Sequence, residues 1–435
     1  MRVAVVGGGI AGLVAARELA GGGAAVTVFE RAPRLGGQAG SFELAPGVHV
    51  ERYYHFICKG DTGYLRMLDE LQLSEQLRWR TTDMGLFYDG TLHTFGDPLS
   101  LLRFPHLSVR DKIRFARTTA AARLRPATRW HDIEHLTAAA WLTEHYGERA
   151  YRLLYEPLLA SKFQDHASRV SAAWMWARLN RLGNSRSRLL KERVGYLEGG
   201  SQAYVDALER ALRERNVDVR VGAHVDRVTV EGGRTSGLIV DGVLDPYDAV
   251  LSTVPVPHTA GLFQDLEGPY FENLRALEYL GVIVMTLHLD RPFSRYYWTN
   301  VSDPRLPMSG VIEATNLNPL PALRGGAVLY IPQYLAHTDE RYARSADQVL
   351  AQYCAALQLM NPDFDRSWIK GYWLHREQFT QPVCDVGFST RVPGIRTPVP
   401  NLYLTDSYQL NPNDRAISFS TDLGREAAEL ILEDR

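Results

Sequence analysis

The fold of this chain is decided by residues 1–37, which read MRVAVVGGGIAGLVAARELAGGGAAVTVFERAPRLGG. A short apolar run over residues 3–6 ends at a cluster of glycines, and residues 13–20 resume with the apolar spacing of a helix. A second apolar run then ends at Glu30. This order of segments predicts a strand, a glycine turn, a helix and a second strand that closes on an acid.

The glycines of this turn have the G-x-G-x-x-G spacing of dinucleotide-binding sites. Gly7 permits a tight turn, Gly9 lets the backbone approach a pyrophosphate, and Gly12 lets the helix pack closely on the strand. The first free N–H groups of the helix then point at phosphate. Glu30, about twenty residues further on, is placed to accept hydrogen bonds from ribose hydroxyls. The residues assigned to this site are Gly7, Gly9, Ile10, Ala11, Gly12 and Glu30.

A second glycine pair follows the second strand, within RAPRLGGQ at residues 31–38. From residue 3 to residue 37 the chain resembles the FAD-binding motif of the amine oxidase, protoporphyrinogen oxidase and phytoene desaturase superfamily, to which UDP-galactopyranose mutase is related. The resemblance implies non-covalent FAD, which the paired glycines approach where a side chain would obstruct it. Many members carry Arg or Lys where this chain has Gln38. The FAD residues implied here are Arg31, Arg34, Gly36, Gly37 and Gln38.

The resemblance continues in two later parts of the chain. Residues 400–406 read as a strand that ends in an acid, and residues 417–432 read as an amphipathic helix. In the superfamily that acid binds the ribitol or pyrophosphate region, and the first N–H groups of the helix face the O2 edge of the flavin. Residues 195–228 resemble the return of the chain to the FAD domain. The further FAD residues implied are Val225, which contacts adenine through its backbone, and Asp406, Arg415 and Ile417.

The resemblance implies an α/β fold with two domains. One is a Rossmann-like FAD-binding domain of the glutathione-reductase-2 type, and the other combines a mixed sheet with helices that bind the substrate. The expected FAD-binding segments are 1–80, 195–255 and 373–435, and the expected substrate-binding segments are 81–194 and 256–372. Apolar spacing near 3.6 predicts helices over residues 108–125, 137–146 and 148–159, and a long strand-like run covers residues 281–289.

Composition limits the partners and the compartment. The chain has 435 residues, and its 48 basic and 50 acidic residues give a net charge of −2, which argues against a nucleic-acid partner. Cys58, Cys354 and Cys384 lack the spacing of a disulfide framework or a metal site, so we expect reduced thiols and no metal. Because Val3 already belongs to the cofactor fold, we expect no signal peptide and a cytoplasmic enzyme. No apolar stretch is long enough to span a bilayer.

Residues 103–125 allow two interpretations. Their arginines, with Phe104, Leu107, Ile113 and Phe115, could form an amphipathic surface that meets membrane lipid. Alternatively, the helix packs on its own domain and leaves its arginines in water.

The candidates for catalysis lie in two segments. GVHVERYYHF at residues 47–56 follows the second glycine pair by about ten residues, where chains of the superfamily pass beside the flavin ring, and it resembles the histidine-bearing loop of UDP-galactopyranose mutase. The predicted proton-transfer or flavin-contacting residues here are His49, Glu51 and His55. The two histidines could instead be structural. In the second segment, residues 373–382, we expect Arg376 and Gln381 to reach the cavity over the ring.

The resemblance implies a small-molecule substrate and leaves two types of reaction open. The favoured version is an FAD-dependent oxidoreductase that passes hydride from a substrate C–H bond to flavin N5. Many amine oxidases carry a lysine on the first long strand of the substrate domain, and the run at 279–285 has none. The alternative is a redox-neutral mutase or isomerase on a nucleotide-sugar, which an Arg/Tyr pocket for diphosphate would favour. The arginines that hint at such a pocket are Arg178, Arg181, Arg186 and Arg188.

A substrate floor is also conceivable around residues 156–178. Trp174 and Trp176 lie near Lys162 and Arg178 in the sequence, and such a set can hold a sugar or another anionic substrate. The two tryptophans could equally be core residues.

Overall fold

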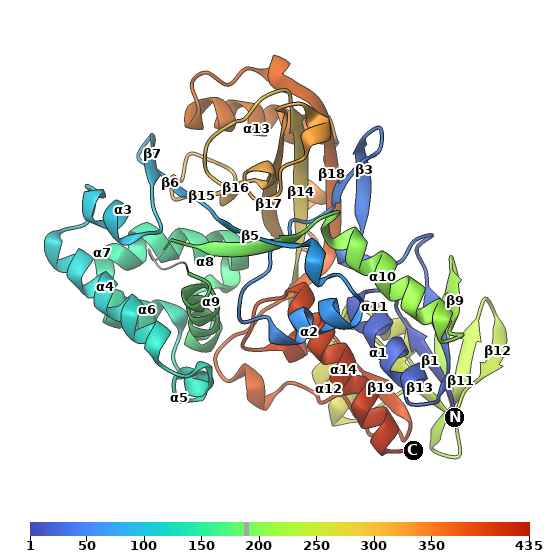
Figure 1. Ribbon diagram of the computed structural model, residues 1–435. Coiled ribbons are helices and arrows are strands. Elements are labelled where there is room, and N and C mark those ends of the chain that lie inside the picture. Colours follow the sequence, from blue (N-terminus) through green and yellow to red (C-terminus); the bar gives the residue numbers. More distant parts are fainter. Residues whose placement is uncertain (187–190) are drawn as a thin grey trace.

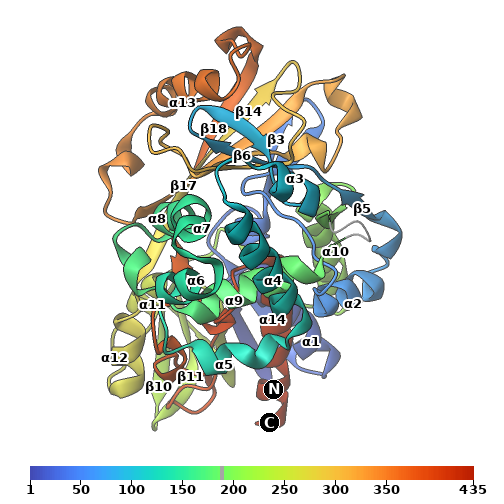
Figure 2. The same ribbon diagram turned by 90° about the vertical axis from the view of Figure 1, so that its left-hand side faces the viewer.

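The computed structural model describes residues 1–186 and 191–435 and shows three parts around one cavity. Figure 1 shows a parallel sheet with its helices at the lower right, a larger sheet at the top and a group of helices at the left. In the view turned by 90° the helical group comes to the front and again lies below the larger sheet (Figure 2). The two sheets and their helices confirm the predicted α/β fold with a second, mixed-sheet and helical part.

The parallel sheet has five strands in the order β19-β13-β1-β2-β9. They span Arg2–Val6 (β1), Ala25–Glu30 (β2), Asp218–Val221 (β9), Ala249–Ser252 (β13) and Leu402–Leu404 (β19). The central strand β1 pairs in parallel with β2 and β13, and Val3 to Val5 are fully buried, as is usual in such sheets. The three chain segments that were predicted to build the cofactor domain therefore contribute strands to one sheet.

Helices and three small sheets complete this part. The helices are α1 (Ile10–Gly21), α2 (Thr62–Glu70), α10 (Gly200–Glu214), α11 (Val256–Leu262), α12 (Pro269–Arg275) and α14 (Ile417–Glu433). The small antiparallel sheets are β3 (Ser41–Ala45) with β4 (Val48–Glu51), β5 (Leu77–Thr81) with β8 (Arg193–Leu197), and β10 (Val225–Glu231) with β11 (Arg234–Val240) and β12 (Val243–Pro246). The final helix thus begins at the predicted Ile417.

Two glycines hold α1 close to its neighbours. A Cβ built on Gly12 would lie 2.0 Å from the carbonyl oxygen of Gly7, so only glycine lets α1 pack on the turn that follows β1. A Cβ built on Gly424 of α14 would lie 2.4 Å from the carbonyl oxygen of Ala11. The first contact is the one that the motif predicted, whereas no motif predicted the second.

The larger sheet has seven strands in the order β18-β14-β17-β16-β15-β6-β7. They span Met84–Tyr88 (β6), Thr91–Thr94 (β7), Tyr279–Leu289 (β14), Trp298–Val301 (β15), Gly310–Glu313 (β16), Ala327–Ala336 (β17) and Ile369–Pro382 (β18), and α13 (Ala346–Met360) packs on the sheet. The long strand expected at 281–289 is present. Strand β18 runs through the expected domain boundary at 373, because it pairs with β14 as far as Pro382.

The helical group, here called the cap, comes from the first insertion. Its helices are α3 (Pro98–Arg103), α4 (Val109–Leu124), α5 (Trp130–Ile133), α6 (Ala138–Tyr146), α7 (Glu148–Ala150), α8 (Glu156–Phe163) and α9 (Ala172–Asn184). The helices predicted at 108–125 and 137–146 are present. The helix predicted at 148–159 is also present, and it contains a π-helical turn over Tyr151–Tyr155 between α7 and α8 that the spacing did not predict. Pro157 in the first turn of α8 lacks the N–H that would continue a regular helix through this point.

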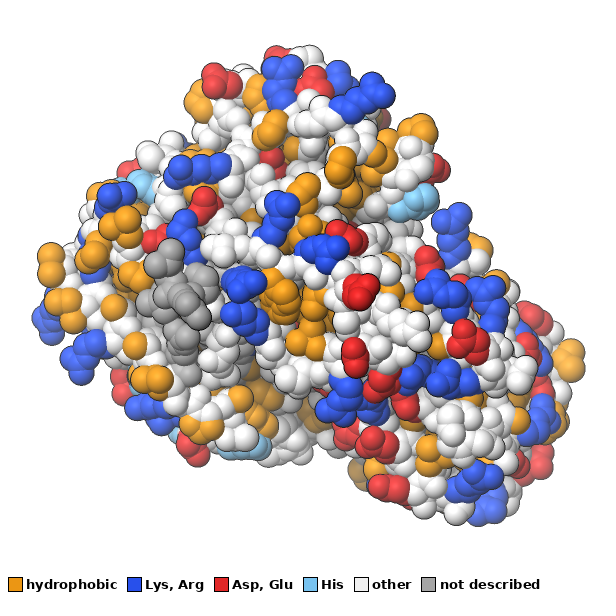
Figure 3. Space-filling model, viewed as in Figure 1, with side chains coloured by type: hydrophobic (Ala, Val, Ile, Leu, Met, Phe, Trp, Pro, Cys, Tyr) orange, Lys and Arg blue, Asp and Glu red, His pale blue; other side chains and the backbone are white. Residues whose placement is uncertain are grey.

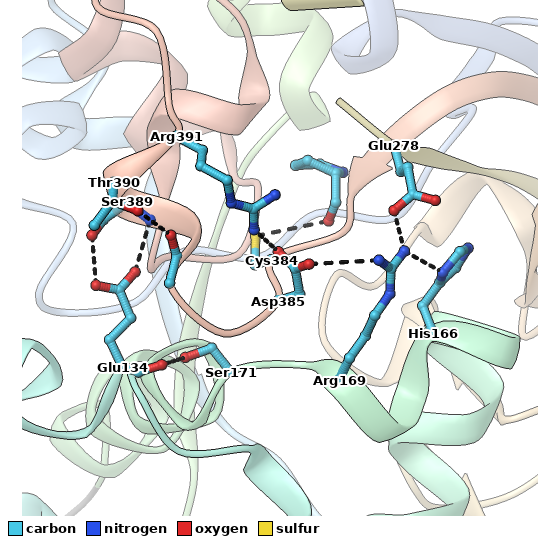
Figure 4. Close-up of polar contacts among 12 residues, drawn as sticks. Glu134, His166, Arg169, Ser171, Glu278, Cys384, Asp385, Ser389, Thr390 and Arg391 are labelled. Atoms are coloured by element: carbon cyan, nitrogen blue, oxygen red, sulfur yellow. Dashed lines mark hydrogen bonds and ion pairs between the residues drawn. The ribbon is translucent and has the colours of Figure 1, made fainter. Parts of the chain in front are cut away.

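Polar contacts fix the cap to the segment between β18 and β19 (Figure 4). The carboxylate of Glu134 accepts the N–H of Ser389 at 2.8 Å and its hydroxyl at 2.5 Å. The hydroxyl of Ser171 donates to the backbone oxygen of Glu134 at 3.0 Å, and the N–H of Ser171 donates to the carbonyl of Cys384 at 2.9 Å. Glu134 is buried, so these bonds satisfy a carboxylate that lies between two parts of the molecule.

A charged chain continues this interface (Figure 4). Arg169, just before α9, forms ion pairs with Glu278, next to β14, and with Asp385. Asp385 also pairs with Arg391. The cap is therefore tied both to the segment between β18 and β19 and to the start of the long strand β14, and these contacts fix the position of α8 and α9 at the cavity.

We expect Gly424→Ala to lower the free energy of unfolding by about 1–3 kcal/mol, because the added methyl group forces α14 away from α1. Chemical denaturation of the holoprotein measures the change. Gly21→Ala is the matched control: it lies at the exposed end of α1, and a Cβ there would meet nothing within 4 Å among the described residues. It should stabilise the protein by up to about 1 kcal/mol. Equal effects of the two variants would refute the close-packing argument.

Candidate active site

A cavity of about 720 Å³ lies where the parallel sheet, the larger sheet and the cap meet. Small-molecule and cofactor sites usually have volumes of about 300–1,000 Å³. The lining residues come from all three expected cofactor segments and from both insertions. One cavity therefore receives the dinucleotide motif and the polar side chains of the second part.

The dinucleotide end is formed by the glycine turn and the N-terminus of α1. Gly7, Gly9, Ile10 and Ala11 line the cavity, while Gly12 faces the turn as described above. A Cβ built on Gly9 would meet nothing within 4 Å in the described part of the chain, so this backbone faces the cavity. No described side chain caps α1, and its first turn carries no acid. The free N–H groups therefore suit an anion, and this end of the cavity fits a pyrophosphate.

Glu30 ends β2 and lines the cavity, as the motif requires. Its Oε2 accepts the N–H of Gly8 at 2.7 Å, and its Oε1 accepts the N–H of Ala32 at 2.7 Å. The carboxylate is thus held by the two turns that flank it, which leaves lone pairs for a ribose hydroxyl. Arg31 also lines the cavity, whereas Arg34 is exposed and is not among the lining residues described.

Asp406 follows β19 and lines the cavity together with Val225, the first residue of β10. Its Oδ2 accepts the N–H of Val256 at 2.8 Å and the hydroxyl of Tyr279 at 2.5 Å. Its Oδ1 accepts the hydroxyl of Ser407 at 2.9 Å. Burial raises the pKa of Asp406, and these donors act against that rise. Asp406 therefore links three parts of the chain by hydrogen bonds and is also a candidate FAD-binding residue.

The second glycine pair packs against the first glycine turn. The N–H of Gly36 donates to the carbonyl of Gly8 at 2.8 Å, and a Cβ on Gly37 would lie 3.1 Å from the Cα of Gly9. Both glycines have positive φ and line the cavity. A guanidinium nitrogen of Arg52 donates to the carbonyl of Gly37 at 2.5 Å. Arg52, which also lines the cavity, is a basic residue at this turn that the sequence did not single out.

The N-terminus of α14 also opens on the cavity. Ala416 and Ile417 line it, no side chain among the described residues caps the helix, and its first turn carries no acid. The preceding Arg415 donates to Gln38 Oε1 at 2.9 Å and to the Tyr334 hydroxyl at 3.0 Å. Gln38 thus stands where many relatives have a cation and accepts a hydrogen bond from one. This end of α14 fits the polar edge of a flavin.

Two of the predicted catalytic residues line the cavity. His55 is inside it, and its buried Nδ1 has no hydrogen-bond partner in the described part of the chain. Burial, and then the charge of Arg415, lower the pKa of His55 to about 4, so the ring is neutral at pH 7. Arg376 lies on β18, lines the cavity and donates to the carbonyl of Arg344 at 2.6 Å.

The other three predicted catalytic residues are not among the lining residues described. His49 is exposed on β4. Glu51 accepts the N–H of Ser201 at 3.0 Å in the first turn of α10, so it caps that helix. Gln381 is buried, and its amide donates to the carbonyl of Pro382 at 3.1 Å. Strand β4 ends at Glu51, and the cavity is lined by the segment 52–56 that follows it, so the sequence could not say where along residues 47–56 the chain reaches the cavity.

The wall opposite the dinucleotide end is apolar and aromatic. Val282 and Val284 reach the cavity from β14, at the strand where many amine oxidases have a lysine. Tyr54, Phe56 and Trp298 line the same cavity, and the rings of Tyr54 and Trp298 meet edge to face with centroids 5.1 Å apart. Aromatic walls of this kind bind the apolar body of a ligand.

A charged cluster on this wall brings together Lys162 and Arg178, which the sequence analysis had named for an anionic substrate, with Asp414, which it had not connected to them. Lys162 of α8 donates to Asp414 Oδ2 at 2.6 Å, and Arg178 of α9 donates to the same oxygen at 3.2 Å. Arg415 and Tyr334 stand beside them and, like the other three, line the cavity. Lys162 and Asp414 are 252 positions apart, so no local pattern connects them.

The suggested tryptophan floor is wrong. Trp174 and Trp176 are buried in the core of the cap and are not among the lining residues described. The indole N–H of Trp176 donates to the carbonyl of Ala127 at 3.1 Å. Trp174 contacts the charged cluster instead: its ring centroid is 5.2 Å from Lys162 Nζ, within the range of a cation–π interaction.

The arginines named for a diphosphate pocket separate. Arg178 and Arg181 line the cavity, but Arg181 makes a bidentate ion pair with Asp61 at 2.8 and 3.0 Å. Arg186 donates to the carbonyl of Gly96 at 2.7 Å and is not among the lining residues described. Arg188 lies outside the described residues. Of the three arginines that the structure describes, Arg178 is the one that contacts the charged cluster.

Comparisons with known proteins agree with this geometry. The family model for flavin containing amine oxidoreductases matches residues 10–431. A 15-cis-phytoene desaturase of Synechococcus elongatus is 22% identical over 465 residues, which cover 99% of this chain and 96% of that protein. An oxidoreductase from Methanosarcina mazei has a similar structure, with a TM-score of 0.76, 19% identity and coverage of 99% of this chain and 100% of that one. Cyclohexylamine oxidase from Brevibacterium oxydans gives a TM-score of 0.73 at 16% identity, with coverage of 99% and 98%.

We expect Gly9→Val to abolish FAD binding while the protein stays folded. The new side chain would occupy the approach to the pyrophosphate, yet a Cβ there meets no described protein atom within 4 Å. Visible flavin absorption of the purified variant, read beside its circular dichroism, measures both effects. Gly60→Val is the control, since Gly60 has the same free surroundings away from the cavity. Stoichiometric FAD in Gly9→Val would refute the assignment of this turn.

Proposed function

The chain belongs to the flavin-containing amine oxidoreductase family, and from that premise we propose that it takes a hydride from a C–H bond of a small organic molecule. It is an FAD-dependent oxidoreductase, which confirms the predicted superfamily, cofactor and enzyme class. The identities of the individual binding and catalytic residues remain proposals. The observation that supports them best is a single cavity with a phosphate-binding end and an aromatic end.

Bound FAD supplies the hydride acceptor in this family. The chain itself would hold the pyrophosphate at the N-terminus of α1 and the ribose at Glu30, and it would place the N-terminus of α14 against the flavin. Val282, Val284 and the aromatic side chains would exclude water and align the donor carbon. His55 offers a neutral ring for proton exchange or for a contact at the flavin edge.

The valines of β14 favour a dehydrogenase or desaturase over an amine oxidase. Position 282 or 284 is where a lysine would have to stand to hold water near the flavin, and neither valine can form a hydrogen bond through its side chain. The desaturase relatives agree with this preference. We therefore propose dehydrogenation of a small molecule in a biosynthetic pathway, with an acceptor other than oxygen.

A redox-neutral mutase or isomerase acting on a nucleotide-sugar stays as the alternative. The observation in its favour is that Arg178, Tyr54 and Tyr334 line one cavity with Lys162 and Arg415. Such a reaction would use the same FAD site and the same anion-binding wall. The two functions differ in whether the substrate leaves the flavin reduced.

We propose that the enzyme is cytoplasmic and that α3 and α4 can meet a membrane surface. No helix among the described residues is long and apolar enough to cross a membrane. Of the apolar residues first suggested for this surface, Phe104 and Leu107 are buried and Ile113 is exposed. Of the eleven exposed large apolar side chains described, five lie on α3 and α4, namely Leu99, Leu102, Val109, Ile113 and Leu124. Figure 3 shows apolar and basic side chains adjoining over these helices at the left of the molecule.

The proposed chemistry predicts a slow reaction of the reduced enzyme with oxygen. After anaerobic reduction with dithionite, we expect the flavin absorption to return over many minutes in air, because β14 holds no lysine. Return within seconds would contradict a dehydrogenase and indicate an oxidase. In a second experiment the enzyme is incubated with nucleotide-sugars. A product that forms only when the flavin is reduced, and that is not oxidised relative to the substrate, would favour the mutase.

The membrane proposal predicts that the enzyme sediments with vesicles of anionic phospholipid. The double variant Leu102→Asp with Ile113→Asp should lose most of this binding, since both side chains are more than half exposed. Val243→Asp with Leu244→Asp is a matched control at an equally exposed apolar pair on β12. Equal loss in both double variants, or no binding by the unmodified protein, would refute the proposal.

A further inference from the structure

We propose that the substrate carries a negative charge, a carboxylate or a phosphate, and that Lys162, Arg178 and Arg415 hold it in the cavity. The inference rests on the proposed function and specifies the substrate class of that same site. All three cations line the cavity beside the aromatic wall. Lys162 and Arg178 come from the cap, on α8 and α9, and Arg415 precedes α14.

The charges in this cluster do not balance. Lys162 and Arg178 share one carboxylate oxygen of Asp414, at 2.6 and 3.2 Å. The guanidinium of Arg415 donates to the uncharged Gln38 and Tyr334, and the backbone N–H of Arg415 donates to Asp414 Oδ1 at 3.1 Å. Three cations therefore face the one carboxylate that they contact, and the next acid that acts on them is the buried Glu192, which interacts with Arg178 through its charge. With both acids counted, one positive charge is still in excess among the described groups of the cluster.

Burial makes this excess costly. The side chains of Lys162, Asp414 and Arg178 are only 8%, 15% and 22% exposed. A charge removed from water is stable only when it is paired or strongly hydrogen-bonded. An anionic group on the ligand would supply the missing charge at the one place where the cluster borders the cavity.

The pKa values of two neighbouring groups indicate the same excess of positive charge. Burial acts to raise the pKa of Tyr334, yet the charges of Lys162 and Arg415 outweigh burial and lower it. Burial likewise acts to raise the pKa of Asp414, and Lys162 and Arg178 hold it below its usual value. Any anion placed beside these groups, including that of a substrate, gains the same stabilisation.

The aromatic side chains beside the cations indicate what the rest of the ligand is like. Tyr54, Phe56 and Trp298 line the cavity together with the cations, so an apolar body and an anionic end can both be accommodated. A protonated amine would meet like charges. An uncharged hydrocarbon would leave the buried cations with no added partner.

Calorimetric titration with four matched probes tests the proposal on the holoprotein. The probes are phenylacetate, phenyl phosphate, benzyl alcohol and benzylamine. We expect at least one of the two anions to bind ten or more times more tightly than benzyl alcohol, and benzylamine to bind most weakly. The tighter of the two anions distinguishes a phosphate from a carboxylate. Equal affinity for phenylacetate, phenyl phosphate and benzyl alcohol, or tightest binding of benzylamine, would overturn the proposal.

Variants locate the binding. Lys162→Met should weaken the preferred anion at least tenfold and leave benzyl alcohol unchanged. Lys191→Met is its matched control, because Lys191 also pairs with an aspartate, Asp83 at 2.8 Å, but is 41% exposed and does not line the cavity described. Asp414→Asn removes the competing carboxylate and should tighten the anion several-fold. If Lys162→Met and Asp414→Asn weaken it equally, the ion pair is only structural and the proposal fails.

Flavin content is measured separately on each sample. Calorimetry does not depend on flavin, so a protein that lacks FAD yet selects anions would refute the proposed function and leave the anion site standing. A protein that holds FAD but prefers the amine would refute the anion site alone.

Discussion

The close contact between two glycine turns is the constraint on which the cofactor end of this enzyme depends. Gly36 donates its N–H to the carbonyl of Gly8, and Gly37 lies against Gly9 so tightly that a Cβ would come within 3.1 Å of its Cα. A side chain at this point would separate the turns and move the N-terminus of α1. A residue without a side chain is likewise required at Gly424, where α14 packs against α1. Two helix ends that no side chain of the described residues caps are thereby brought to one cavity.

The cap depends on a different kind of interaction. Glu134 and Arg169 bind the segment between β18 and β19, and Arg169 also reaches Glu278 beside β14. These contacts fix α8 and α9 relative to the cofactor domain, and α8 and α9 carry Lys162 and Arg178. Polar bonds between domains are directional, so they set the orientation of the cap as well as its distance. The chemistry of the cavity wall is thus positioned by residues that do not line it.

The sequence predicted what local spacing and a family motif can encode. The glycine turn, Glu30 and the start of the last helix follow from short runs of residues, and the structure has them where expected. Which part of residues 47–56 reaches the cavity depends on where β4 ends and on the path of the loop after it, which no local pattern fixes. The pairing of Lys162 with Asp414 joins residues 252 positions apart. The π-helical turn before α8 adjoins a proline whose effect on the helix was not anticipated. Long-range pairing and the path of a loop are tertiary properties, so the binding motif was easier to find than the substrate wall.

Lys162 and Arg178 share the carboxylate of Asp414, and this sharing determines how the charged wall of the cavity can bind an anionic ligand. Breaking a buried ion pair usually costs about 3–5 kcal/mol, because the remaining charge is left without a partner. Here Lys162 and Arg178 both bind Oδ2 of Asp414, so one cation can turn towards an anion while the other keeps the carboxylate paired. Arg415 is held by neutral acceptors and can meet the anion without leaving any acid alone. The surplus of cations is therefore compatible with a stable cap and leaves positive charge available to the cavity.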